Sequence, residues 1–76
     1  MNHYTLEYKL SLPMQNRLLT AKEVSLRIGK SVGWIYKYEK LSQFPSPIKI
    51  NSRNVLWQGE EIETWISNLN QNKGAF

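Results

Sequence analysis

The fold is decided by residues 20–57, which read TAKEVSLRIGKSVGWIYKYEKLSQFPSPIKINSRNVLW. Thr20 is a good helix N-cap, and Glu23 stands three residues later, as in a capping box. Gly29 follows at the far end, and glycine takes the left-handed cap conformation at little cost. The spacing therefore predicts a first helix that starts after Thr20 and ends before Gly29.

A second short helix is expected directly after the first. Ser31 is its candidate N-cap, and Ile35 and Tyr38 fall on one face at i and i+3. Gly33 and the neighbouring aromatic residues lower helix propensity, so this helix needs tertiary packing or a ligand to hold it. Two helices joined by so short a turn predict a helix-turn-helix.

The chain after these helices has the pattern of a β-hairpin. Residues 44–47 hold two prolines one residue apart, which excludes a helix interior. Residues 48–50 alternate in polarity and residues 55–57 are apolar, so both stretches predict strands. Residues 51–54 have turn chemistry, because asparagine tolerates positive φ.

A last helix is expected over residues 59–70. Ile62, Trp65, Ile66 and Leu69 recur at i, i+3, i+4 and i+7, which marks one apolar stripe. Three glutamates at its start complement the positive end of the helix dipole. We expect Trp65, like Trp57 in the hairpin, to belong to the core.

The N-terminal segment has a different period. In residues 2–12, apolar side chains alternate with polar ones from Tyr4 to Leu12, and Pro13 follows. Period 2 predicts a half-buried strand that the proline ends. Such a strand could join the sheet of the hairpin, or its unpaired edge could associate with a second copy of the chain.

The expected order is strand, helix, helix, hairpin, helix. This is an α+β fold: a winged helix-turn-helix, with a two-helix motif, a β-hairpin wing and a C-terminal helix, plus an extra N-terminal β-strand. We expect an N-terminal strand extension over residues 1–16, the winged domain over residues 17–70 and a flexible tail over residues 71–76.

Composition narrows the class of protein. The 76 residues suffice for one small domain, and the absence of cysteine excludes disulfides and thiolate metal sites. No apolar run approaches the roughly 20 residues that cross a bilayer, and the start does not resemble a secretory signal. We therefore expect a cytoplasmic protein without a membrane partner.

The net charge of +4 is unevenly distributed. Residues 17–58 carry eight basic residues against two acidic ones, Glu23 and Glu39, whereas residues 59–70 carry three glutamates and no base. This asymmetry is typical of a polyanion-binding face with a more acidic back. The alternative is a solubility charge spread around the surface.

The residues that enzymes use most are scarce. The chain has no aspartate or cysteine, and His3 near the N-terminus is its single histidine. Metal ligands and histidine bases are therefore nearly absent, and no glycine-rich phosphate loop is present. We expect no catalysis, no metal and no cofactor.

The charge and the order of elements instead predict binding to double-stranded DNA. In the cell, we expect the protein to be associated with the nucleoid. The second helix would enter the major groove and the wing would reach the neighbouring backbone. The residues expected to contact DNA from the recognition helix are Lys30, Ser31, Val32, Gly33, Trp34, Tyr36, Lys37 and Lys40. Those expected from the wing are Lys49, Asn51, Ser52, Arg53 and Asn54.

Three of these positions allow two interpretations. Trp34 could pack in the core or project into the groove. Tyr36 could touch a base or phosphate, or pack under the wing. Arg53 could enter a narrow minor groove or bind a phosphate. The lysines would add affinity and salt dependence more than sequence choice.

From Arg17 to Ile66, the pattern resembles the AlpA family of small phage and mobile-element DNA-binding proteins, whose shape is related to excisionases and MerR-type regulators. Asn51 and Ser52 stand where glycine is common in the family's wing, and the N-terminal strand lies outside the common core. The matching residues are Arg17-Leu18-Leu19-Thr20, Lys22-Glu23-Val24, Gly29-Lys30-Ser31, Ile35-Tyr36-Lys37, Phe44-Pro45-Ser46-Pro47-Ile48-Lys49-Ile50, Arg53, Trp57, Ile62 and Trp65-Ile66.

The resemblance implies one of two roles. Members of this family activate a promoter, or act as recombination directionality factors that bend DNA beside an attachment site and steer an integrase toward excision. We expect the excisionase role, with copies side by side on DNA and an integrase as a partner. The alternatives are a transcription regulator and, in another class, an antirepressor or protein-binding adaptor that uses the N-terminal strand and Trp34.

Overall fold

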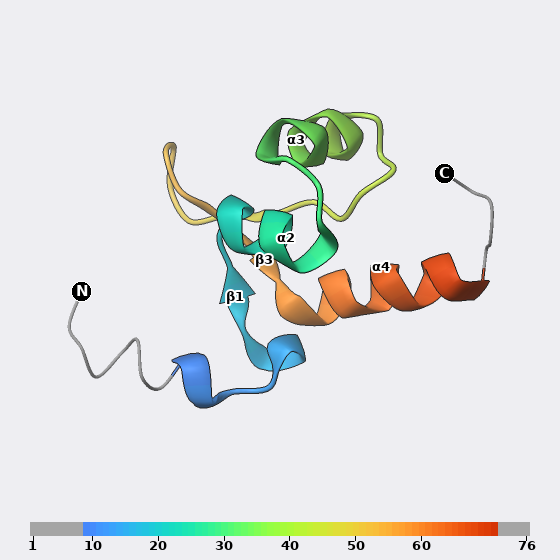
Figure 1. Cartoon of the computed structure of the whole chain (residues 1–76). Helices are drawn as coiled ribbons and strands as arrows, with labels where there is room; N and C mark the ends of the chain where they lie inside the picture. Colours follow the sequence, from blue (N-terminus) through green and yellow to red (C-terminus); the bar gives the residue numbers. More distant parts are fainter. Residues whose placement is uncertain (1–8, 72–76) are drawn as a thin grey trace.

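The computed structural model describes residues 9–71 (Figure 1). The elements are a 3-10 helix η1 (Met14–Asn16), strand β1 (Leu18–Leu19), helices α2 (Ala21–Ile28) and α3 (Val32–Lys40), strands β2 (Ile48–Lys49) and β3 (Val55–Gln58), and helix α4 (Gly59–Gln71).

Helix α2 begins and ends where its caps predict. The Glu23 backbone N–H donates to Thr20 Oγ1 at 3.1 Å, and the Thr20 N–H donates to Glu23 Oε1 at 2.9 Å, which completes the capping box. Gly29 closes the helix in the left-handed conformation with φ 77°. Both local predictions are confirmed.

Helix α3 is also capped as expected at its start, but the left-handed residue that follows it is a serine, whereas the one after α2 is a glycine. Ser31 accepts a hydrogen bond from the Trp34 N–H at 3.1 Å. At the other end, Ser42 takes the left-handed conformation with φ 59°, and Gln43 N–H donates to Tyr38 O at 2.9 Å. This pattern is a Schellman motif, usually built with glycine at the position of Ser42.

The sheet has three antiparallel strands in the order β1-β3-β2. Leu19 lies opposite Trp57 on one side of β3, and Ile48 lies opposite Leu56 on the other. The predicted hairpin is therefore present. The third strand of the sheet is the short strand β1, which lies directly before α2 in the chain.

The strand predicted over residues 2–12 is wrong where the structure describes it. Residues 9–11 form a helical turn, and the rest of that prediction lies outside the described residues. Side chains from two later positions hold this turn. Lys9 Nζ lies 2.8 Å from Glu23 Oε1, and the Arg17 guanidinium donates to Leu10 O at 3.0 Å and to Leu12 O at 2.8 Å. Strand β3 is already paired on both edges, with β1 and with β2, so an N-terminal strand could not pair with it.

The core lies where α2, α3 and α4 meet the sheet. Trp57 is fully buried at its centre, and its indole N–H donates to Pro45 O at 2.8 Å. This bond ties the loop after α3 to the sheet. The buried apolar side chains are Leu19, Val24, Ile35, Phe44, Trp57 and Ile62.

Helix α4 follows β3 without a connecting loop, and its first turn packs against η1. Gly59 is buried there, and its N–H donates to Arg17 O at 2.7 Å. A side chain at Gly59 would overlap the backbone oxygen of Met14, so glycine permits this close approach. One turn further along α4, Glu63 forms a two-armed ion pair with Arg27 of α2.

Candidate nucleic-acid interface

Helix α3 presents one polar and open face. Ile35 is fully buried and anchors the other face in the core. The remaining predicted contact residues of this helix and the turn before it, except Trp34, are exposed: Lys30, Ser31, Val32, Gly33, Tyr36, Lys37 and Lys40. Figure 1 shows this helix at the top of the molecule, with α2 below it and α4 at the lower right.

Trp34 belongs to the packing of α3. Its ring is half-buried and lies 4.3 Å from Tyr38, 6.0 Å from Phe44 and 6.2 Å from Trp65, measured between ring centroids. These contacts support the packed interpretation of Trp34, and a DNA contact of its exposed part stays a prediction. Two of the three rings come from segments distant in sequence, which the helix pattern could not show.

Lys30, in the turn before α3, and Lys37, within α3, lie beside aromatic rings of that helix. Lys30 Nζ is 5.8 Å from the centre of the Trp34 ring, and Lys37 Nζ is 5.7 Å from the centre of the Tyr38 ring. A cation at this distance is attracted to the face of the ring. The rings therefore orient both ammonium groups along the helix while leaving them exposed to solvent.

Tyr36 lies between α3 and the hairpin. Its ring meets Trp57 edge to face at 5.7 Å, and 38% of the residue is exposed. The two interpretations of Tyr36 therefore do not exclude each other: one edge of the ring packs on the sheet while the rest faces outward.

The tip of the hairpin is built around one asparagine side chain. Asn51 Oδ1 accepts hydrogen bonds from the Arg53 N–H at 2.9 Å and from the Asn54 N–H at 3.0 Å. The expected use of positive φ by asparagine is wrong, since Gly29 and Ser42 are the positive-φ residues within residues 9–71. An acceptor in the side chain closes this turn in place of glycine.

The tip exposes five predicted contact residues. Lys49, Asn51, Ser52, Arg53 and Asn54 are all exposed. The side chains of Asn51 and Asn54 support the turn, and Asn54 Nδ2 donates to Asn51 Oδ1 at 3.2 Å.

A hollow of about 400 Å³ joins the helix to the hairpin. Tyr36 lines it from α3, Arg53 from the hairpin tip and Thr20 from the start of α2, while strand β3 contributes two further residues. The full lining is Thr20, Ala21, Tyr36, Ile50, Arg53, Asn54, Val55 and Leu56. The structure thus brings Tyr36, Arg53 and Asn54 to one place, while the remaining predicted residues lie on the surfaces around it.

Five residues that line this hollow were not among the predicted contacts: Ile50, Val55 and Leu56 of the hairpin, and Thr20 and Ala21 at the start of α2. The capping box was visible in the sequence, but it explained Thr20 as a structural residue. The signal that could have found Thr20 and Ala21 is general: an N-terminal turn of a helix carries unpaired backbone N–H groups that attract anions.

The charged residues around this hollow are mostly basic. In the part of the chain that the structure describes, no carboxylate forms an ion pair with the cations of α3 and the hairpin tip, and the recorded pairs are Lys9–Glu23 and Arg27–Glu63. Glu39 is half-buried on α3, where Ser46 Oγ lies 3.4 Å from its carboxylate. The cations Lys30, Lys37, Lys40, Lys49 and Arg53 are therefore available to an anionic partner.

The fold and this surface define a small α+β domain compatible with a helix-turn-helix protein. A family model described as prophage CP4-57 regulatory protein (AlpA) matches residues 17–70, and the chain belongs to this family. Neither a curated protein nor a solved structure matches the chain significantly. Among residues 9–71, no helix is long and apolar enough to span a membrane.

Proposed function

We propose that the protein binds double-stranded DNA sequence-specifically as a winged helix-turn-helix, with α3 in the major groove and the β2–β3 hairpin as its wing. The observation that carries the proposal is the hollow between Tyr36 and Arg53, bordered by exposed cations without an acidic partner among the described residues. A helix flanked by a basic hairpin suits a groove flanked by phosphates.

The side chains divide by role in this proposal. Lys37, Lys40 and Lys49 contact phosphates, which supplies affinity and salt dependence. Tyr36 and Val32 face base edges, and Gly33 allows the helix backbone to approach them. Arg53 extends from the tip to the adjacent backbone or a narrow minor groove.

The proposed biological role is that of an excisionase in a phage or another mobile element. A domain of this size covers few base pairs, so useful occupancy requires several copies on repeated sites or a neighbouring integrase. The bent DNA beside an attachment site would be the product, and the protein would act by binding and not by catalysis. It would work in the cytoplasm, on the nucleoid.

Transcriptional control is the second candidate. It is favoured by the description of the family as a prophage regulatory protein. The DNA contacts would be the same, and only the position of the sites would differ: promoters for a regulator, an attachment site for an excisionase.

The decisive experiment is the capture of sheared source-genome DNA by the purified protein at low and high salt, followed by sequencing of the bound fragments. Repeated short sites next to an attachment site would support the excisionase role. Sites over a promoter would support the regulator instead. If no fragment is enriched at either salt concentration, DNA binding is wrong, and a role as a protein adaptor becomes the better hypothesis.

A further inference from the structure

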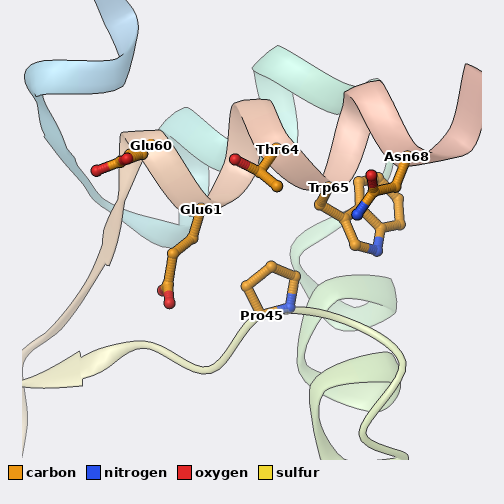
Figure 2. Close-up of a pocket in the computed structure, with 6 residues that line it drawn as sticks. All are labelled: Pro45, Glu60, Glu61, Thr64, Trp65 and Asn68. Carbon is orange, nitrogen blue, oxygen red and sulfur yellow. The ribbon is translucent and has the colours of Figure 1, made fainter.

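A second hollow lies beside α4. It has a volume of about 410 Å³ and is formed between α4 and the loop that follows α3 (Figure 2). We call it the α4 groove; its lining residues are Pro45, Glu60, Glu61, Thr64, Trp65 and Asn68. None of them borders the hollow between α3 and the hairpin.

The apolar part of the α4 groove is rigid. The Trp65 indole N–H donates to Gln43 O at 3.2 Å, and its ring meets Phe44 edge to face at 4.8 Å. Pro45 is the next residue in the same loop, and the Trp57 indole N–H donates to its carbonyl oxygen at 2.8 Å. Trp65 and Pro45 therefore form a preformed surface, which lowers the entropic cost of binding a side chain against them.

The polar part of the groove is acidic. Glu63 points to α2 and pairs with Arg27, so its charge is compensated. Glu60 and Glu61 are exposed and form no ion pair with a cation of the described residues. In Figure 2, the Glu61 side chain extends from α4 toward the loop that carries Pro45. These carboxylates repel phosphate, so DNA does not suit this surface.

We infer that the α4 groove binds a cationic peptide segment of another protein. The segment carries a lysine or arginine for Glu60 and Glu61, next to a proline or aliphatic side chain for Pro45 and Trp65. An aromatic face beside carboxylates also favours a guanidinium or ammonium group over a neutral side chain. Thr64 adds a hydrogen-bonding group along α4.

The occupant is a different protein and not a second copy. This choice rests on the proposed function, because the exposed cations of the chain itself are concentrated on α3 and the hairpin tip, where DNA would cover them. A partner docked on α4 would leave that surface open, so both could be bound at once.

The test uses a library of short random peptides displayed on phage, selected on the full-length protein without DNA at low salt. The enriched peptides should carry lysine or arginine beside proline or an aliphatic residue. The best peptide, made synthetically, should shift the amide or indole NMR signals of Thr64, Trp65 and Asn68 and leave those of α3 and the hairpin tip unchanged. Its affinity should fall as salt rises.

The double variant Glu60→Gln, Glu61→Gln should weaken this peptide by about tenfold, as expected for two exposed ion pairs. Glu63→Gln removes one negative charge from a residue of α4 that does not line the groove, and should leave the affinity unchanged. DNA binding by the double variant should be retained, which separates failure of this inference from failure of the proposed function.

Three results would overturn the inference. They are no enriched peptide, enriched peptides without basic residues, or an equal loss of affinity in the Glu60→Gln, Glu61→Gln double variant and in Glu63→Gln. A fourth comes from sedimentation of the protein alone. Self-association that the double variant abolishes would identify a second copy as the occupant.

Discussion

The surroundings of two glycines differ, and they show how two regions of the molecule differ in packing. Gly59 begins α4 at the junction with β3 and η1, where an added Cβ would overlap Met14 O and lie 2.9 Å from Arg17 O. Gly33 lies in the first turn of α3, where the nearest atom to such a Cβ would be Ser31 Oγ at 3.9 Å. One glycine permits backbones to touch, and the other leaves a surface open. The tightly packed junction and the proposed DNA-binding surface therefore lie at different places in this chain.

The largest effect is expected at the junction. Gly59→Ala should destabilise the protein by more than about 3 kcal/mol, because the clash is with backbone atoms that cannot rotate away and ordinary overpacking already costs ~1–3 kcal/mol. For a domain of 76 residues this is a large share of the total stability. Urea unfolding followed by circular dichroism measures it. A loss below about 1 kcal/mol would show that η1 yields easily and that the junction is not rigid.

The second effect belongs to the open surface. Lys37→Ala and Arg53→Ala should each weaken DNA binding by about 1–2 kcal/mol, roughly tenfold, with unchanged stability. Each should also lower the slope of log affinity against log salt by about one, because one phosphate contact is lost. Fluorescence anisotropy with a captured DNA fragment gives both quantities.

Lys37→Arg is the matched control, since it keeps the charge and should keep the salt slope. Normal affinity and slope in both alanine variants would remove α3 and the hairpin tip from the DNA interface. Lower affinity accompanied by a lower unfolding midpoint would assign the side chains to the fold instead.

The contrast also explains what the sequence could predict. The start of α2, its end at Gly29 and the start of α3 at Ser31 were predicted correctly, because a helix cap is encoded within about four residues. The hairpin was predicted for the same reason, from two apolar stretches around turn residues. Interactions between distant segments carry no such local mark.

The errors arose where distant segments compete. Residues 9–11 have the alternation of a strand, yet β3 pairs with Leu18 and Leu19, a stretch too short to show any period. The position of Trp34 was left open for the same reason, because its packing depends on Phe44 and Trp65. The hollow beside Thr20 likewise exists only once α2, α3 and the hairpin have packed together.

The third prediction tests whether the open surface is open for a ligand. Gly33→Ala should raise stability by about 0.5–1 kcal/mol, because alanine is the better helix former and meets no close neighbour. The same methyl group should weaken DNA binding, since the proposal brings DNA against this turn. Thermal unfolding and anisotropy should thus move in opposite directions. If affinity is unchanged, DNA does not approach α3 at Gly33.

The smallest effect concerns the charge that links the segment before η1 to α2. Burial opposes ionisation of Glu23, but hydrogen bonds from Lys9 and Thr20 outweigh it and lower the pKa of this carboxyl below its ordinary value of 4.5. A carboxyl with a lowered folded-state pKa adds stability above the unfolded-state pKa. That contribution disappears as the pH falls through the folded-state pKa.

The protein should therefore lose stability below about pH 4.5. Lys9→Gln should reduce the part of this loss that comes from Glu23. The difference should be at most about 1 kcal/mol, because water screens a pair of which the Glu23 side chain is 36% exposed. Urea unfolding from neutral to acidic pH, compared between the two proteins, isolates it from the other glutamates. Parallel curves would mean that the backbone N–H of Thr20 alone stabilises the carboxylate, and that Lys9 does not couple the N-terminal turn to the fold.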